Sequence, residues 1–133
     1  MIDVAGQRLE HHALGAHVDA FRTVADGIGV VDAEITLAGV DNLHEFLTHH
    51  LLPHAQAEEA VLYPLIDRLM GAADSTATMR RDHVEIVRLA DQLAQLRKAL
   101  HSGRVPVSIE RDLRRTLYGL HVLVALNLAK EDE

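Results

Sequence analysis

The sequence contains no cysteine, few aromatic residues and no excess of positive charge, and each absence excludes a class of protein. Without cysteine there is no disulfide framework, no thiolate-bound zinc, no cysteine-held iron–sulfur cluster and no cysteine nucleophile. Thirteen basic against twenty acidic residues give a formal net charge of −7, which repels a phosphate backbone, so nucleic acid is not an expected partner. Only two tyrosines and two phenylalanines are present, so leucine, valine, isoleucine and alanine must fill most of the core.

Long apolar runs are missing as well. The uncharged apolar stretch at residues 122–129 is far shorter than the roughly 20 residues that a membrane-spanning helix needs. The first ten residues have neither the basic start nor the apolar stretch of a signal peptide. We therefore expect a soluble cytoplasmic protein that does not bind a membrane, with residues 1–133 forming one domain of ordinary size.

Glycine and proline interrupt the chain at few places, and the segments between them have the period of amphipathic helices. The pattern predicts helices over residues 7–28 and 33–70, a third that follows capping residues Asp74 and Ser75, and a fourth that starts at a cap at Ser108. The apolar residues predicted to face inward are, helix by helix, Leu14, Phe21, Val24 and Ile28; Val40, Leu43, Leu47, Val61 and Leu65; Met79, Ile86, Val87, Ala90 and Leu93; and Leu113, Leu117, Leu120 and Val124.

Four amphipathic segments joined by short loops indicate an all-α protein. The simplest topology is an up-down-up-down antiparallel four-helix bundle. Pro53 lies inside the second predicted helix, where a proline removes a backbone donor. We therefore expect this helix to be kinked or split near Pro53.

Several polar residues fall on the predicted inner faces, which is unexpected for a core. Burying a polar group without a partner costs roughly 1 to 3 kcal/mol, and an unpaired charge costs more. These residues must therefore satisfy one another or a metal ion. They are His17, His54, Glu58, His83, Asn127 and Glu131.

The heights of these residues along the bundle decide whether they form a cluster. His83 and Asn127 lie at nearly equal distances from the loop that joins their helices, so they meet at one level of an antiparallel pair. His17 fits less well, because it lies about 11 residues from the end of its helix while His54 lies about 21 from the start of the next. The cluster is thus expected at one level, with the first helix in imperfect register.

His54 and Glu58 are four residues apart, so their side chains lie one turn apart on the same helix face. Such a pair can hold one ion or two adjacent ions, because a carboxylate that bridges two cations screens their repulsion. Imidazole and carboxylate ligands without thiolate suit iron or manganese, and zinc is also possible. His50 lies one turn before His54 and stays open as a further ligand.

The sequence has ten histidines, and most of the others are predicted to lie off the inner faces. His101, near the end of the third helix, is expected to act as a cation opposite the helix dipole. The histidines predicted to be surface or flanking residues are His11, His12, His44, His49 and His121.

Other metal-site and enzyme motifs are absent from the sequence. No glutamate has a histidine three residues later, as ferritin-like sites require, and the His-Glu-x-x-His pattern of zinc proteases fails at Thr48. There is no Gly-x-Ser-x-Gly, phosphate loop or dinucleotide fingerprint. Because no general acid or base for turnover can be named, ligand binding is favoured over an enzymatic role.

Three segments stand out together: the run at residues 46–64, the Arg-Asp-His at residues 81–83 and the acidic ending at residues 129–133. They resemble the hemerythrin-like (HHE cation-binding) domains, and the likeness covers nearly the whole chain. The resemblance implies a four-helix bundle with a non-haem di-iron centre that binds dioxygen or, in relatives, serves redox, nitric oxide or iron-handling roles. By motif position it implies the metal ligands His17, His54, Glu58, His83 and Glu131.

The sequence departs from that family at two positions. Asn127 stands where the fourth helix usually carries a histidine, and Val87 stands where the oxygen carriers have a second histidine on the third helix. One iron would therefore have a reduced ligand set, completed by water, by Asn127 or by nothing, and Asn127 is expected to act at the cofactor as a hydrogen-bonding residue.

The sequence thus predicts a protein that binds one or two non-haem iron ions, with manganese or zinc as alternatives. The expected ligand is dioxygen, nitric oxide or peroxide, bound for sensing, storage or redox; no protein partner can be named. The alternative prediction is a bundle that has lost its metal and serves as a structural or interaction domain.

Overall fold

The computed structural model describes the backbone of residues 4–71, 76–100 and 104–132 and the side chains of residues 11–71, 76–100 and 104–131. All regular structure in these ranges is helical. Two of the elements, η1 and η2, are single π-helical turns. The elements are α1 (Val4–Gly27), α2 (Ala33–Phe46), η1 (Leu47–Leu51), α3 (Leu52–Ala57), η2 (Glu58–Leu62), α4 (Tyr63–Met70), α5 (Ala77–Lys98) and α6 (Val107–Asp132).

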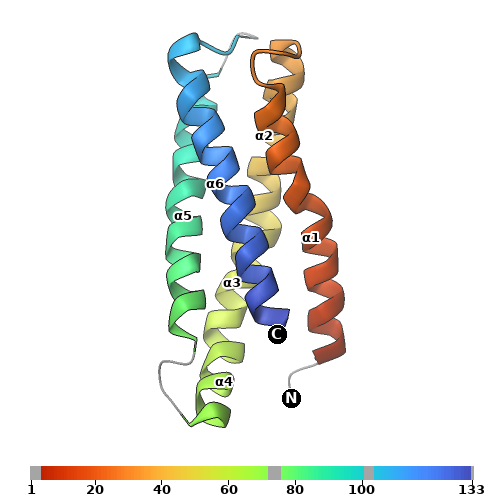
Figure 1. Cartoon of the computed structure of the whole chain (residues 1–133), viewed down its shortest axis with the longest axis vertical. Coiled ribbons are helices and arrows are strands. Elements are labelled where there is room, and N and C mark those ends of the chain that lie inside the picture. The colour runs from red at the N-terminus through yellow and green to blue at the C-terminus, as the bar shows by residue number, and fades with distance from the viewer. Residues whose placement is uncertain (1–3, 72–75, 101–103, 133) are drawn as a thin grey trace.

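The elements form four long helical segments, which we call arms. Helices α1, α5 and α6 are each one arm, and the second arm is the unbroken run of α2, η1, α3, η2 and α4. Figure 1 shows the arms side by side along the long axis, with both chain termini at the same end of the molecule. Helix α1 packs against α2 and α6, and α5 packs against α2 and α6. The predicted up-down-up-down four-helix bundle is confirmed.

The buried residues of α1 recur at alternating spacings of three and four, which keeps one face of the helix against the bundle. This face shares Leu14, Phe21 and Ile28 with the predicted one, but it continues through Val18 and Ala25. Val24 is only half-buried beside it. The inner face is therefore rotated slightly about the helix axis from the predicted one. This rotation decides which histidine of α1 faces the bundle interior.

The second arm contains two π-helical turns, and each ends two residues before a proline. Turn η1 precedes Pro53, and η2 precedes Pro64. A proline has no N–H, and its ring crowds the carbonyl four residues earlier, so a wider turn relieves the clash. A bend of the arm at Pro53 stays a prediction.

The turn η2 also changes which residues face inward. Buried positions of the second arm step from His54 to Glu58 by four residues and then to Tyr63 by five. The extra residue in a π-turn rotates all later side chains around the helix. The predicted inner position of Val61 is therefore wrong, since its side chain is 58% exposed, and Tyr63 takes the inner position instead.

The ends of two arms are fixed by local bonds. Gly71, with a φ of 70°, ends α4 in the left-handed conformation that glycine adopts without strain. Asp67 accepts hydrogen bonds from both the backbone N–H and the hydroxyl of Thr76, each at 3.0 Å, which ties α4 to the start of α5. The predicted caps Asp74 and Ser75 lie outside the described residues.

The start of α6 differs from its prediction. Helix α6 begins at Val107, and the Pro106 carbonyl accepts the N–H groups of Ile109 and Glu110. Ser108 therefore lies inside the helix, and its predicted role as the cap is wrong.

The core changes character along the long axis. Toward the α1–α2 and α5–α6 connections it is apolar and includes Ile28, Val40, Leu93, Leu113 and Leu117. Toward the chain termini the inner positions become polar. No helix in the described ranges is both long and apolar enough to cross a membrane.

On α5 the inner face carries Ile86, Leu89, Ala90 and Leu93. Val87 was predicted to share it, but this side chain is 43% exposed and that prediction is wrong.

Candidate metal centre

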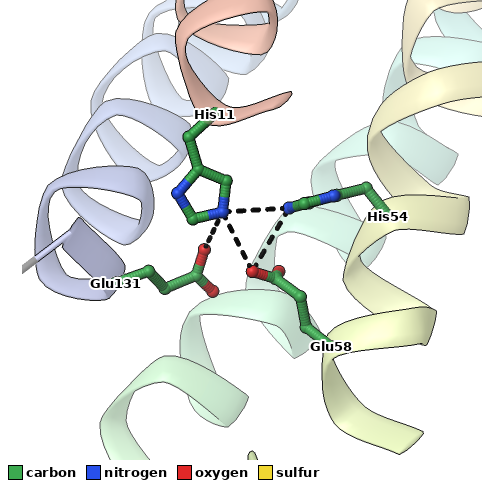
Figure 2. A group of neighbouring side chains, drawn as sticks. All are labelled: His11, His54, Glu58 and Glu131. Atoms are coloured by element: carbon green, nitrogen blue, oxygen red, sulfur yellow. Dashed lines mark hydrogen bonds and ion pairs between the residues drawn. The ribbon is translucent and has the colours of Figure 1, made fainter. Parts of the chain in front are cut away.

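Four polar side chains from three arms converge at the end of the bundle near the chain termini. They are His11 on α1, His54 on α3, Glu58 at the start of η2 and Glu131 on α6, and one ligand atom of each lies within 4.8 Å of all the others. Figure 2 shows His11 reaching toward the other three side chains. His11 Nε2 lies 3.1 Å from His54 Nε2 and 3.2 Å from both Glu58 Oε2 and Glu131 Oε1. We call these four residues the first ligand group.

A second set of donors surrounds His83 on α5. Its Nε2 lies 3.0 Å from the Tyr63 hydroxyl and 3.2 Å from Asn127 Oδ1. It also lies 3.6 Å from Glu58 Oε1 and 3.6 Å from Glu131 Oε2. Four oxygens thus face a single imidazole nitrogen. We call His83, Asn127 and the two glutamates the second ligand group; Tyr63 lies beside it.

The two glutamates belong to both groups. Glu58 turns Oε2 toward His11 and His54 and turns Oε1 toward His83. Glu131 turns Oε1 toward His11 and Oε2 toward His83. If cations were bound in both groups, each of these carboxylates would supply one oxygen to each, and its negative charge would screen their repulsion.

The spacing of the donor atoms fits a metal ion. Imidazole and carboxylate ligands bind at about 2.0–2.2 Å, which places neighbouring donor atoms roughly 3 Å apart. Four contacts in the first ligand group, of 3.1 and 3.2 Å, match this spacing, and all four ligand atoms lie within 4.8 Å of one another. Glu131 Oε1 is buried and accepts no hydrogen bond from the described residues, although it lies beside His11. A cation between these atoms would satisfy that oxygen.

The pKa values of the two carboxylates are shifted in opposite directions. Burial alone would raise the pKa of Glu58, but hydrogen bonds with His11, His54 and Glu131 outweigh it and lower the pKa to about 2. Burial raises the pKa of Glu131, and the neighbouring Glu58 raises it further against the opposing bonds from His83 and Tyr63. Two carboxylates held this close repel each other, and that repulsion favours a cation or a proton between them.

Residues outside the second ligand group fix the orientation of the His83 and Asn127 side chains. His83 Nδ1 donates to Glu59 Oε1 at 3.0 Å, which turns Nε2 toward the cluster. Burial would lower the pKa of His83, but its bonds with Glu131 and Glu59 and the charge of Glu58 raise it overall. Asn127 donates its amide hydrogen to the Met79 carbonyl at 3.4 Å, so its oxygen faces His83.

Tyr63 is fully buried, and its hydroxyl donates to Glu131 Oε2. Burial, that hydrogen bond and the nearby negative charges all raise the pKa of Tyr63. Without a cation, Tyr63 is therefore a neutral hydrogen-bond donor.

The structure brings five of the six predicted site residues together. His54, Glu58, His83, Asn127 and Glu131 all lie in the two ligand groups, with His83 and Asn127 at one level as the helix lengths predicted.

His17 is not among them. It is exposed, its Nδ1 bonds to the Ala13 carbonyl at 3.2 Å, and its ring stacks on Phe46 with 4.6 Å between ring centres. The prediction that His17 faces inward is wrong, because the inner face of α1 passes through Val18 instead.

His11 takes the place expected for His17, and the prediction that it lies off the inner face is wrong. It is only 3% exposed. Two signals in the sequence point to it. It lies three residues before Leu14 on the inner face, and moving six residues along α1 shifts the level by about 9 Å, which removes most of the mismatch with His54. Tyr63 had no such signal, because the π-turn that rotates it inward does not follow from helical spacing.

The remaining histidines lie outside both groups. His50, left open as a ligand, is exposed and faces Phe46, with 6.2 Å between the ring centres. His121 bonds through Nδ1 to the Val18 carbonyl at 3.0 Å. His101 lies outside the described residues. His12 and His49 are exposed as predicted, and His44 is half-buried.

Comparison with known proteins gives one match. A family model described as the hemerythrin HHE cation binding domain matches residues 3–133. No curated protein and no solved structure matches the chain.

Proposed function

The chain belongs to the hemerythrin HHE cation-binding family, and from this premise we propose that it is a non-haem iron-binding protein. In this proposal the two ligand groups hold up to two iron ions, and the centre binds dioxygen, nitric oxide or peroxide for sensing, storage or redox. The observation that carries the proposal is the pair of buried glutamates, each with one oxygen in each ligand group.

The donor set supports iron. Imidazole nitrogens and carboxylate oxygens without thiolate suit iron and manganese, with zinc as a further alternative. Bound iron would supply open coordination positions and redox chemistry for a small oxygen or nitrogen species. The chain itself holds the donors at one level, fixes the His83 ring through Glu59 and keeps His54, Glu58 and His83 largely out of water.

A groove between α1 and α6 supports access by a small ligand. It has a volume of about 840 Å³ and reaches His11. Its other lining residues include the apolar or small Gly15, Ala125 and Leu128 and the polar His12, Asp19 and His121. The groove brings a small molecule as far as the outer side of His11, the residue of the first ligand group that lines it.

Iron analysis and an absorption spectrum test the proposal. Protein loaded anaerobically with ferrous iron and then exposed to air should retain close to two irons per chain and show the charge-transfer bands of an oxo-bridged diferric centre. Iron content near zero, with a spectrum that does not change on loading, would contradict it.

The alternative is a metal-free structural or interaction domain. It draws on the observation that residues of the second ligand group already have hydrogen-bond partners, since Tyr63 donates to Glu131 and His83 donates to Glu59. The two functions differ in linkage. A ligand that binds only the folded state raises its melting temperature, so iron should raise it under our proposal and leave it unchanged under the alternative.

A further inference from the structure

Tyr63 is the one buried tyrosine of the chain, and its oxygen points into the second ligand group. Its side chain is fully buried, whereas Tyr118 is 38% exposed. The π-turn η2 rotates Tyr63 inward, one position later than a regular helix would allow. Single π-turns of this kind are concentrated at functional sites.

The contacts of Tyr63 place its oxygen among the donor atoms of the second ligand group, where the second cation would bind. The hydroxyl lies 3.0 Å from His83 Nε2 and donates to Glu131 Oε2. The ring packs against two neighbours, because it stacks on the His83 ring with 5.3 Å between centres and has the Arg80 guanidinium 5.3 Å from its own centre. The oxygen therefore cannot leave the cluster without repacking these neighbours.

The second position needs a further ligand. It has one imidazole, two carboxylate oxygens from glutamates that it shares with the first position, and the neutral oxygen of Asn127. A phenol oxygen that has lost its proton is a hard anionic ligand, and tyrosine serves iron in this way in other proteins. Its charge would also offset the excess positive charge of two cations in a buried site that holds two carboxylates.

We infer that Tyr63 is a ligand of the second cation, and that its phenol oxygen takes the coordination position for which Asn127 supplies no imidazole. The inference rests on the proposed function, because it requires a bound cation. On binding, the phenol O–H bond breaks, a bond forms between the oxygen and the cation, and the proton passes to solvent. No electron is transferred in this step.

The presence of only two tyrosines makes the test clean. Tyr118 donates its hydroxyl to Asp26, away from both ligand groups, so Tyr118→Phe is a matched control that leaves Tyr63 as the sole tyrosine. Wild type, Y118F and Y63F are loaded with ferrous iron, oxidised in air and examined by visible absorption and by resonance Raman spectroscopy.

A phenolate bound to ferric iron gives a visible charge-transfer band and enhances the phenolate ring modes. Wild type and Y118F should both show these signals, and Y63F should lack them. In metal titrations, Y63F should bind the second equivalent of iron about tenfold more weakly or worse, with the first equivalent little changed.

Iron-loaded Y118F without phenolate modes would overturn the inference, and this holds even if Y63F fails to fold, which circular dichroism would reveal. Folded Y63F that keeps the modes would overturn it equally. If iron binds and only the phenolate signals are missing, the inference fails alone. If wild type binds no iron, the proposed function fails and the inference falls with it.

Discussion

The two ends of the bundle are built on the same four arms and differ in what the arms enclose. At the end near the α1–α2 connection, the inner positions are apolar and include Phe21, Ile28, Leu113 and Leu117. At the end near the chain termini, the same helical spacing places histidine, glutamate and asparagine inside, and the π-turn η2 adds Tyr63. The difference shows that one periodic pattern can specify both a stabilising core and a costly one.

The two ends contribute to stability in opposite ways. Burying a leucine side chain stabilises the fold by about 1.5–3 kcal/mol. Burying carboxylates together costs free energy, and the raised pKa of Glu131 beside Glu58 is the sign of that cost. We therefore expect the apolar end to supply most of the stability of the metal-free bundle and the polar end to be stabilised further when a cation binds.

The largest expected effect is the loss of metal from the polar end. Glu58→Gln keeps the size of the side chain but removes the charge and replaces a carboxylate oxygen of each ligand group with amide atoms. Iron binding, measured by metal analysis after gel filtration, should fall below detection. An E58Q variant that retains the wild-type iron content would show that the two groups do not share this carboxylate as a ligand.

A substitution at the apolar end should lower stability and leave iron binding unchanged. Leu117 is fully buried, so Leu117→Ala leaves a cavity and should lower the free energy of unfolding by about 2–5 kcal/mol in chemical denaturation. Its iron content at a temperature where it stays folded should equal that of wild type. Loss of iron in folded L117A would mean that the two ends are coupled and that the comparison fails.

A smaller effect concerns pH and the metal-free protein. The pKa of His83 is raised above its ordinary 6.5, so its contribution to stability is complete below about pH 6.5 and is lost as the pH rises through the raised value. Glu131 acts in the same direction, since its raised pKa lets the folded state keep a proton that the unfolded state has released. Glu58, with a pKa of about 2, has given its full contribution by about pH 5.

The melting temperature of metal-free protein should therefore fall between pH 5.5 and pH 8. The loss of stability behind this fall is about 1.4 kcal/mol for each tenfold difference in proton affinity between the folded and unfolded states. His83→Gln should flatten the fall. Iron should reverse the trend, because metal binding needs neutral imidazoles and weakens toward pH 6. A metal-free melting temperature that rises over this range would contradict the assigned electrostatics.

The architecture follows from the sequence because periodicity and short loops leave few ways to pack four amphipathic helices. The pairing of His83 with Asn127 follows in the same way, since helix length fixes level in an antiparallel pair. The choice between His11 and His17 does not follow from the apolar pattern alone. Leu14, Phe21 and Ile28 are shared by two faces that differ by a small rotation. The level of His54 favours the face with His11, and packing against α2 and α6 fixes it.

Tyr63 illustrates a different limit. Its inward position depends on a π-turn, and a turn of five residues in place of four leaves no mark in a helical wheel. Pro64 beside it hints at an irregular turn, but proline alone does not say which side chain will rotate inward.

The most direct test of the central claim compares two histidines of the same helix. The structure places His11 in the first ligand group and His17 on the surface against Phe46. His11→Ala and His17→Ala are each titrated with iron and analysed for bound metal. We predict that H11A loses iron from the first position while H17A binds iron as wild type does. Full iron binding by H11A, or its loss in H17A alone, would contradict that claim.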